Sequence, residues 1–167
     1  MSSKFEILMN QLDMPLEMRN SEAFLNAEIE KVLVHKVSRV WEFHFSFANI
    51  LPIEIFRELQ KRLAQEFSKT GNQAIFEIHC QAPQVSDELL QAYYQLAFEE
   101  GPCASHGFKS LYQDLRVHLD GDKLLIEGPS TIDTEHFRKN HLPNLSQQLV
   151  KYGFPQLTCQ VQHSDEL

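Results

Sequence analysis

The sequence predicts an α+β fold made of two small modules, each with the order strand, strand, helix, strand (ββαβ) and with helices in front. Two observations carry this prediction. Segments with alternating apolar residues are separated by segments whose apolar residues recur at helical spacing, and the whole order occurs twice between residues 28 and 162. The 167 residues are enough for two cores of about 80 residues each. We place the modules at residues 1–83 and 84–167.

Helical signals open the first module. Ser3 and Glu6 have the spacing of a capping box, in which the serine and the glutamate satisfy each other's free backbone amides. Apolar residues follow at helical spacing until Pro15, which ends this helix. A further turn or two of helix is expected between Ser21 and Ala27.

Two strands follow, and their patterns differ. The strand 29–36 has three apolar residues in succession at 32–34, which predicts that both of its faces are covered. The next strand places four aromatic residues on one face: Trp41, Phe43, Phe45 and Phe47. Such a row is compatible with a platform for stacking nucleic-acid bases. We interpret it as core, because the helix that starts near Pro52 carries a matching apolar stripe, and a third strand at 74–80 closes the module.

The second module starts with a helix capped by Ser86 and stopped at Gly101-Pro102. A short helix is expected from Phe108 to Gln113, and Asp120-Gly121-Asp122 is a hairpin turn between two strands. The next helix is capped by Thr131 or Asp133 and interrupted at Pro143, and a last strand covers 157–161.

The order of elements from Phe108 to Val161 is that of a type II KH domain. KH domains hold nucleic acid with a Gly-x-x-Gly loop between two adjacent helices, where only glycine lets the backbone come so close. This chain has His141-Leu142-Pro143-Asn144 at that place. The second module is therefore expected to have KH-like topology without the Gly-x-x-Gly grip.

Composition limits the classes of function. The net charge of −8 weighs against broad binding to nucleic acid, whose phosphates such a surface repels. No apolar run reaches the roughly 18 residues that span a bilayer, and the first residues lack a signal-peptide layout, so a cytoplasmic protein is expected. Cys80, Cys103 and Cys159 share no metal-type spacing and are expected to be reduced thiols.

Three histidines and two glutamates fall on the outward phase of the first module's strands: His35, His44, His79, Glu42 and Glu77. If the strands are neighbours, a metal cluster is geometrically possible. None of these residues has the tight spacing of a known metal site, so we interpret them as a polar sheet face, solvated or covered by the second module. We predict no metal site and no catalytic residue, because no nucleophile or phosphate-binding motif is present.

Four basic residues of the first module form the candidate nucleic-acid contact: Lys36, Arg39, Arg57 and Lys61. The first two flank a hairpin, and the last two lie one turn apart on the outward face of a helix. The alternative is a solvated surface, because glutamates interleave with the basic residues of that helix.

Several runs also resemble a known family. The runs Glu30–Lys36, Val40–Phe45, Asn49–Pro52, 88–94 and 101–109 are similar to the extreme N-terminus of PolC, the DNA polymerase III alpha subunit of Gram-positive bacteria, and to its streptococcal members in particular. The resemblance spans essentially the whole chain. It implies that the chain is a fragment of a large replicative polymerase with a 3′–5′ exonuclease, ahead of which two small N-terminal domains lie.

The resemblance also sets expectations for activity and partners. None of the metal-binding acidic residues of polymerase or exonuclease can be carried over to this chain, so it is expected to have no polymerase activity and no cofactor, while the parent would need Mg²⁺. The family's N-terminal region also resembles the polymerase-binding domain of the clamp-loader tau subunit, which suggests contacts with replisome proteins.

Three hypotheses follow. The first is a non-catalytic module that binds another replisome protein, with the tau subunit as the candidate partner. The second is a module that binds single-stranded nucleic acid and guides template or primer to the polymerase core. The third is a structural cap that stabilises the rest of the polymerase.

Overall fold

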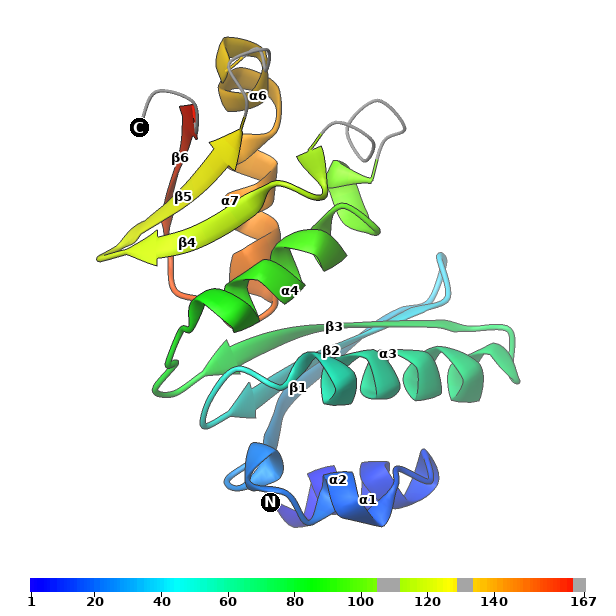
Figure 1. The fold of residues 1–167 in the computed structure, drawn as a ribbon. Helices are drawn as coiled ribbons and strands as arrows, with labels where there is room; N and C mark the ends of the chain where they lie inside the picture. Colours follow the sequence, from blue (N-terminus) through cyan, green and yellow to red (C-terminus); the bar gives the residue numbers. More distant parts are fainter. Residues whose placement is uncertain (105–111, 129–133, 164–167) are drawn as a thin grey trace. The chain divides into compact units, whose positions relative to one another are not determined.

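The computed structural model describes residues 1–104, 112–128 and 134–163 and shows the α+β fold (Figure 1). The chain divides into two compact units, Met1–Gln84 and Val85–Leu167, which we call the first and the second unit. Each contains a three-stranded sheet, and in each the sheet is formed in the order strand, strand, helical crossover, strand, with one helix in the first crossover and two in the second. The predicted fold class is therefore confirmed.

The first unit combines a short helical N-terminal segment with a sheet and one long helix. Its elements are α1 (Ser3–Gln11), α2 (Leu16–Arg19), the 3₁₀ turn η1 (Glu22–Phe24), β1 (Glu28–His35), β2 (Val40–Phe47), α3 (Ile53–Ser68) and β3 (Gln73–Cys80).

The second unit has shorter strands and a divided helix. Its described elements are α4 (Asp87–Ala97), the 3₁₀ turn η2 (Gly101–Cys103), β4 (Arg116–Asp120), β5 (Lys123–Gly128), α6 (Thr134–Asn140), α7 (Leu142–Lys151) and β6 (Thr158–His163). Most of the helix predicted from Phe108 lies outside the described residues, as do Thr131 and Asp133, the two predicted caps of the later helix.

The two sheets have the same topology. The strand orders are β1-β2-β3 and β4-β5-β6. In each sheet the first pair is antiparallel and joined by a hairpin, and the second pair is parallel. A parallel pair requires a crossover connection, which α3 provides in the first unit and α6 with α7 in the second.

The aromatic face of β2 is the core of the first unit. Phe43, Phe45 and Phe47 are at most 4% exposed. The ring of Phe67 in α3 lies 5.5 Å from that of Phe43, and Phe5 of α1 packs edge-on against Phe45 and Phe47 at 5.6 Å. The core interpretation is confirmed, and a base-stacking platform is excluded because helices cover this face.

The start of α1 corrects the predicted capping box. Ser2 is the N-cap: it has the extended backbone of a cap residue, and its Oγ accepts a hydrogen bond from the Phe5 amide at 3.4 Å. Ser3 is already helical, so the prediction was wrong by one position. The helix also ends before Pro15, at Gln11, and Pro15 instead precedes α2.

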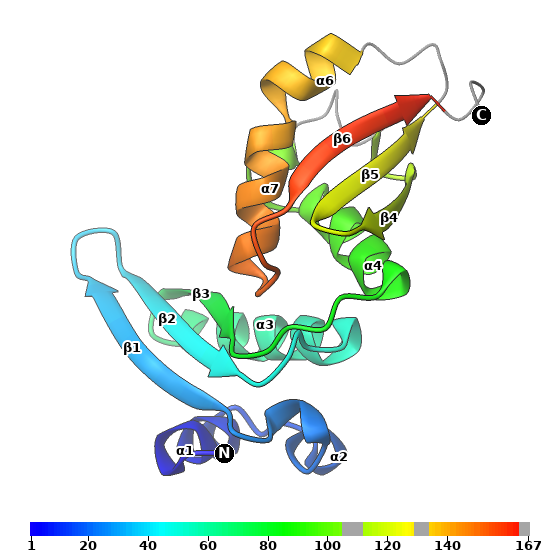
Figure 2. The ribbon, with the colours of Figure 1, turned by 90° about the vertical axis from the view of Figure 1, so that its left-hand side faces the viewer.

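Strand β1 contradicts a second expectation. Its side chains are exposed at seven of eight positions, including Val32 (37%), Leu33 (40%) and Val34 (46%). The prediction that both faces are covered was wrong, because an apolar run alone does not distinguish a buried central strand from a strand at the edge of a sheet. β1 pairs only with β2 and forms one edge of the sheet (Figure 2).

In the second unit α4 packs against β4 and α7. Tyr93 of α4 packs against the rings of Tyr152 and Phe154 at 5.1 and 5.4 Å, and Ser86 caps α4 as predicted. The break in the helix pair lies at His141, and Pro143 falls within the first turn of α7, where a missing amide costs nothing. No helix in the described ranges is long and apolar enough to cross a membrane.

Candidate protein-interaction surface

Hydrogen bonds at the two ends of β3 establish which backbone groups of β2 face which neighbour. The Gln73 amide donates to the Arg39 carbonyl and the Gln81 amide donates to the Phe47 carbonyl, both at 2.9 Å. Odd-numbered residues of β2 therefore turn their backbone groups toward β3. Since N–H and C=O groups alternate in direction along a strand, even-numbered residues of β2 turn theirs toward β1.

This alternation leaves backbone groups of β1 pointing outward. Opposite the even-numbered β2 residues lie His35 and Leu33, which bond to β2. Val32 and Val34 alternate with them and turn N–H and C=O groups to the other side. No strand in the described part of the chain pairs with that side of β1, so these groups line an open edge.

The corresponding edge of the second unit is closed by side chains of α4. The Val117 amide donates to Gln91 Oε1 and the Leu119 amide donates to Asp87 Oδ1, both at 2.8 Å. Gln91 Nε2 in turn donates to the Leu115 carbonyl at 2.9 Å. The outward amides of Val117 and Leu119 thus have acceptors without a fourth strand.

Val32 and Val34 occupy the same places in β1 as Val117 and Leu119 do in β4. The last pair before each hairpin turn is His35 with Val40 and, in the second unit, Asp120 with Lys123. Counted back from those pairs, Val34 matches Leu119 and Val32 matches Val117. The side chains at these matching positions differ in burial: Val117 is 2% exposed, whereas Val32 is 37% exposed.

On the polar face of the first sheet, histidine ring nitrogens lie close to glutamate carboxylate oxygens. His44 Nε2 lies 2.6 Å from Glu42 Oε2 and His44 Nδ1 lies 3.8 Å from Glu77 Oε2. His79 pairs instead with Glu30, at 3.1 Å. Among the described residues, no three or more His, Cys, Asp or Glu side chains are grouped so that they could hold a metal ion. These side chains therefore form a polar face on which histidine rings lie beside glutamate carboxylates.

The four predicted nucleic-acid contacts do not form one patch. Lys36 and Arg39 lie in the β1–β2 hairpin, and the Arg39 guanidinium donates to the Thr70 carbonyl at 2.8 Å, just past the end of α3. Arg57 precedes Thr70 by 13 positions, which is roughly 20 Å at the rise of a helix. Lys36 and Arg39 thus lie in the same hairpin, and Arg57 lies far from both of them. Lys61 lies in α3, one helical turn after Arg57.

Acidic residues of α3 are paired with its basic ones. The hydrogen bond from Arg62 lowers the pKa of Glu58, and that from Lys69 lowers the pKa of Glu66. Both pairs have the spacing of neighbours on a helix surface. The helix surface around Lys61 is therefore of mixed charge.

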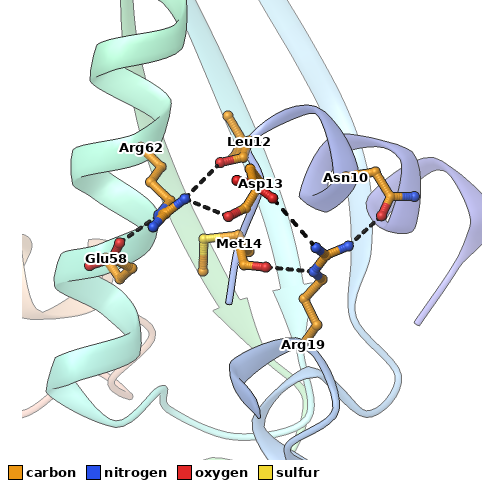
Figure 3. Close-up of polar contacts among 7 residues, drawn as sticks. All are labelled: Asn10, Leu12, Asp13, Met14, Arg19, Glu58 and Arg62. Atoms are coloured by element: carbon orange, nitrogen blue, oxygen red, sulfur yellow. Dashed lines mark hydrogen bonds and ion pairs between the residues drawn. The ribbon is translucent and has the colours of Figure 1, made fainter. Parts of the chain in front are cut away.

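Two arginines that the sequence analysis missed hold the N-terminal helices in place (Figure 3). Arg62 of α3 donates to the carbonyls of Leu12 and Asp13 at the end of α1 while it pairs with Glu58. Arg19 of α2 donates to the Met14 carbonyl at 2.6 Å. The spacing of Glu58 and Arg62 signals a helix pair, but nothing in the sequence indicates the carbonyls that Arg62 binds.

A shallow groove of about 430 Å³ lies beside the α6–α7 turn of the second unit. Ser146 Oγ donates to the Leu157 carbonyl at 3.2 Å and accepts from Gln156 at 2.9 Å, which ties α7 to the segment before β6. The groove is lined by both polar and apolar side chains, namely Arg138, Leu142, Pro143, Ser146, Gln147, Gln156, Leu157, Thr158 and Cys159.

Comparison with known proteins identifies the family. Residues 4–78 match the family described as DNA polymerase III polC-type N-terminus I, and residues 92–166 match DNA polymerase III polC-type N-terminus II. The chain belongs to the polC-type family of DNA polymerase III. The resemblance to PolC is therefore confirmed.

Curated relatives agree with this family over the whole chain. Proteins called DNA polymerase III PolC-type are 98% identical in Streptococcus sanguinis, 63% identical in Streptococcus pneumoniae and 49% identical in Streptococcus pyogenes. Each match covers 100% of this chain and 11% of the relative. No solved structure matches the chain significantly.

The two polC-type matches fall one in each structural unit. The match to N-terminus I contains β1, β2, α3 and most of β3, and the match to N-terminus II contains the whole second sheet. The open edge at Val32 and Val34 therefore belongs to polC-type N-terminus I, and the closed edge and the groove belong to polC-type N-terminus II.

The three cysteines are free thiols. Burial raises the pKa of Cys80, Cys103 and Cys159 to about 11. Since the thiolate is the reactive form of cysteine, these thiols are poor nucleophiles near neutral pH and act as packing groups.

Proposed function

We propose that this chain is a non-catalytic N-terminal part of a PolC-type DNA polymerase III and that it binds another protein of the replisome in the cytoplasm. One observation carries the proposal: β1 presents three exposed apolar side chains and an edge with which no strand among the described residues pairs. An exposed edge strand of this kind is a template for pairing with another chain.

The parent's activities are assigned to other regions in this proposal. DNA-templated synthesis, 3′–5′ proofreading and the Mg²⁺ that they require would belong to parts of the parent outside the 11% that this chain matches. We assign no cofactor to the chain itself. Its contribution is to connect the polymerase with a second protein, and the first partner to test is the clamp-loader tau subunit.

A backbone amide NMR titration tests the proposal. The ¹⁵N-labelled chain is mixed with purified tau subunit, and then with the other replisome proteins one at a time, at moderate salt. We expect localised shifts in the first unit with at least one of them. If every protein leaves the spectrum unchanged, and a polymerase lacking residues 1–167 still assembles with all its partners, the interaction role is wrong and the structural-cap hypothesis remains.

The groove of the second unit favours single-stranded DNA binding as a second candidate function. It lies beside the helix–helix turn at which KH domains hold nucleic acid, and Arg138 is among its lining residues. Lys36, Arg39, Arg57 and Lys61 of the first unit are the other candidate contacts. Fluorescence anisotropy with an oligo-dT strand tests this function.

Binding to DNA should weaken steeply between low and moderate salt, because phosphate contacts release counterions. Arg138→Gln should weaken binding if the groove is used, and Arg57→Gln with Lys61→Gln should do so if α3 is used. No binding at low salt would dispose of this function.

A further inference from the structure

We propose that the groove of the second unit takes an extended segment of a partner protein, which pairs with the outer edge of β6 and carries an acidic residue next to an apolar one. This surface goes beyond the proposed function, which β1 of the first unit carries, because it gives the second unit a protein-binding site of its own. Three features carry the inference: the main-chain groups of β6, the apolar side chains of the groove and its charge.

Every second residue of β6 turns its main-chain groups away from β5. The Thr158 amide donates to the Asp122 carbonyl at 3.1 Å, and Thr158 lies opposite Lys123 in the parallel pair β5–β6. Because this direction alternates along a strand, Cys159 and Val161 turn N–H and C=O groups to the other side. Among the residues that the structure describes, no strand lies on that side of β6 (Figure 2). An added strand can therefore pair with these groups.

The groove lies along this edge of β6. Thr158 and Cys159 are successive strand residues, so their side chains lie on opposite faces of the sheet, and both line the groove. Leu142 and Ser146 line it from α7, and Ser146 Oγ donates to the Leu157 carbonyl at 3.2 Å. An extended segment in the groove would therefore lie between β6 and α7, beside the main chain of Cys159.

The apolar side chains of the groove specify one residue of the segment. Leu142 and Leu157 both line the groove and are 6% and 5% exposed, and Pro143 lies beside Leu142 in the lining. The groove measures about 430 Å³, which is large enough to hold a bound side chain. An apolar residue of the segment would cover the two leucines and lose its own contact with water.

The charge of the groove specifies the neighbouring residue. None of the described lining residues is acidic, and Arg138 is charged. The stretch 136–163, which supplies all of them, has no Asp or Glu, although the whole chain has a net charge of −8. The nearest acidic residues in the sequence, Glu135 and Asp165, lie outside it. A carboxylate on the segment can therefore pair with Arg138 without meeting a like charge from α7 or β6.

The lining residues favour a peptide over a nucleic-acid strand. None of those described is aromatic, whereas grooves for single strands stack bases on aromatic rings. One arginine can meet one phosphate, and the affinity for a strand depends on how many phosphates are neutralised. His141 and Asn144 also stand at the two glycine positions of a KH loop, where only glycine allows the close approach of nucleic acid.

A second copy of the chain lacks the acidic residue. Pairing β6 with β6 of another copy would bring Thr158–His163 to the groove, and this strand contains no Asp or Glu. It would supply no carboxylate for Arg138. A partner of different sequence is therefore the occupant that the charge of the groove favours.

The test selects the peptide and then reads its position on β6. A phage-displayed library of random peptides is panned against the 167-residue chain, and enriched peptides are synthesised. We expect an apolar residue next to Asp or Glu in them. A bound peptide should slow hydrogen exchange at the amides of Cys159 and Val161, which point outward. The amides of Thr158 and Gln160 face β5 and should keep their exchange rates, so they are the internal control.

Two neighbouring cations of α6 provide a matched pair of variants. Arg138→Gln removes the charge that lines the groove and should weaken binding of the acidic peptide about fivefold, as loss of an exposed ion pair can. Lys139→Gln removes the same charge from a residue that is not among the lining residues. It should change the affinity less than Arg138→Gln does.

Each contrary outcome overturns the inference. If no enriched peptide slows exchange at Cys159 and Val161, strand addition to β6 is wrong. Peptides without Asp or Glu, or equal effects of Arg138→Gln and Lys139→Gln, exclude the acidic residue. Displacement of the peptide by oligo-dT assigns the groove to DNA, and dimers that the peptide dissociates assign it to a second copy. If a replisome protein still shifts the signals of the first unit, the proposed function stands.

Discussion

The two units share one sheet topology, but they differ in the surroundings of the first strand of each sheet. In the second unit α4 lies beside β4 and bonds to its outward amides through Asp87 and Gln91. In the first unit the helices that precede β1 are instead held through Arg19 and Arg62, which bond to main-chain carbonyls at the end of α1 (Figure 3). A shared strand order therefore does not determine whether the outward amides of the first strand have acceptors. In the second unit two polar side chains of α4 provide those acceptors.

A second difference lies in the crossover. The first unit crosses with one helix, α3, and the second with α6 and α7, which meet at His141. The His141 side chain is buried near the rings of Tyr112 and Phe137. A titratable side chain therefore lies between α6 and α7 in the second unit, where the crossover helix of the first unit, α3, is uninterrupted.

The largest expected effect is loss of the first unit's aromatic core. Phe45→Ala removes a fully buried ring that contacts Phe5 and Phe76, and should lower the free energy of unfolding by about 4 kcal/mol. Chemical denaturation, followed through NMR signals of the first unit, measures it. Val37→Ala at a fully exposed position is the control. A change below about 1 kcal/mol for Phe45→Ala would mean that this face is not the core.

Acid should destabilise the second unit through His141. Burial lowers its pKa from 6.5 to about 4, with a further contribution from His136. Between these two values the unfolded chain binds the proton more readily than the folded one, so stability falls as the pH drops below about 6.5 and reaches its limit below about 4. The loss should be on the order of 3 kcal/mol.

His141→Phe removes this titration and is the matched variant. Unfolding followed by second-unit signals at pH 7.5, 5.5 and 4.5 compares the two proteins. Identical pH dependence in the wild type and in His141→Phe would show that His141 does not titrate as described.

Gln91→Leu should open the closed edge of β4. The Val117 amide would lose its acceptor while its side chain stays buried, which should cost about 2 kcal/mol. Amide exchange at Val117 should accelerate at the same time. Gln147→Leu on α7 is the control, because Gln147 is exposed. Unchanged exchange at Val117 would mean that Gln91 does not close this edge.

Arg62→Met should have the smallest effect, about 1 kcal/mol, because the arginine's hydrogen bonds are partly exposed. The loss should appear as faster amide exchange in α1. Lys61→Met, at the exposed neighbouring position of α3, should leave α1 unchanged. Equal effects of the two substitutions would contradict the assignment of Arg62 as the residue that holds α1.

Local sequence patterns predicted which segments form helices and strands better than they predicted what covers those segments. The alternation at Phe43, Phe45 and Phe47 indicated a buried face, because it matched the apolar stripe of the next helix. Val32-Leu33-Val34 gave a wrong prediction of burial, since exposure at an edge depends on which strands lie beside it. The break at His141 was placed at Pro143, because proline signals a boundary but tolerates the first turn of a helix.

The closed edge could not be predicted because it depends on contacts far apart in the sequence. Gln91 bonds to Val117 across 26 positions and Asp87 bonds to Leu119 across 32. Neither side chain has a local signal for this role beyond its place in the first turns of a helix. The apolar run at 32–34 was visible in the sequence, but its position in an exposed edge strand was not.

Hydrogen exchange at single amides tests the contrast between the two edges most directly. In the isolated 167-residue chain, the outward amides of Val32 and Val34 should exchange much faster than those of Val117 and Leu119, because the latter two donate to Gln91 and Asp87. Equal protection of all four amides in the isolated chain would show that the β1 edge is already covered, and would contradict the account.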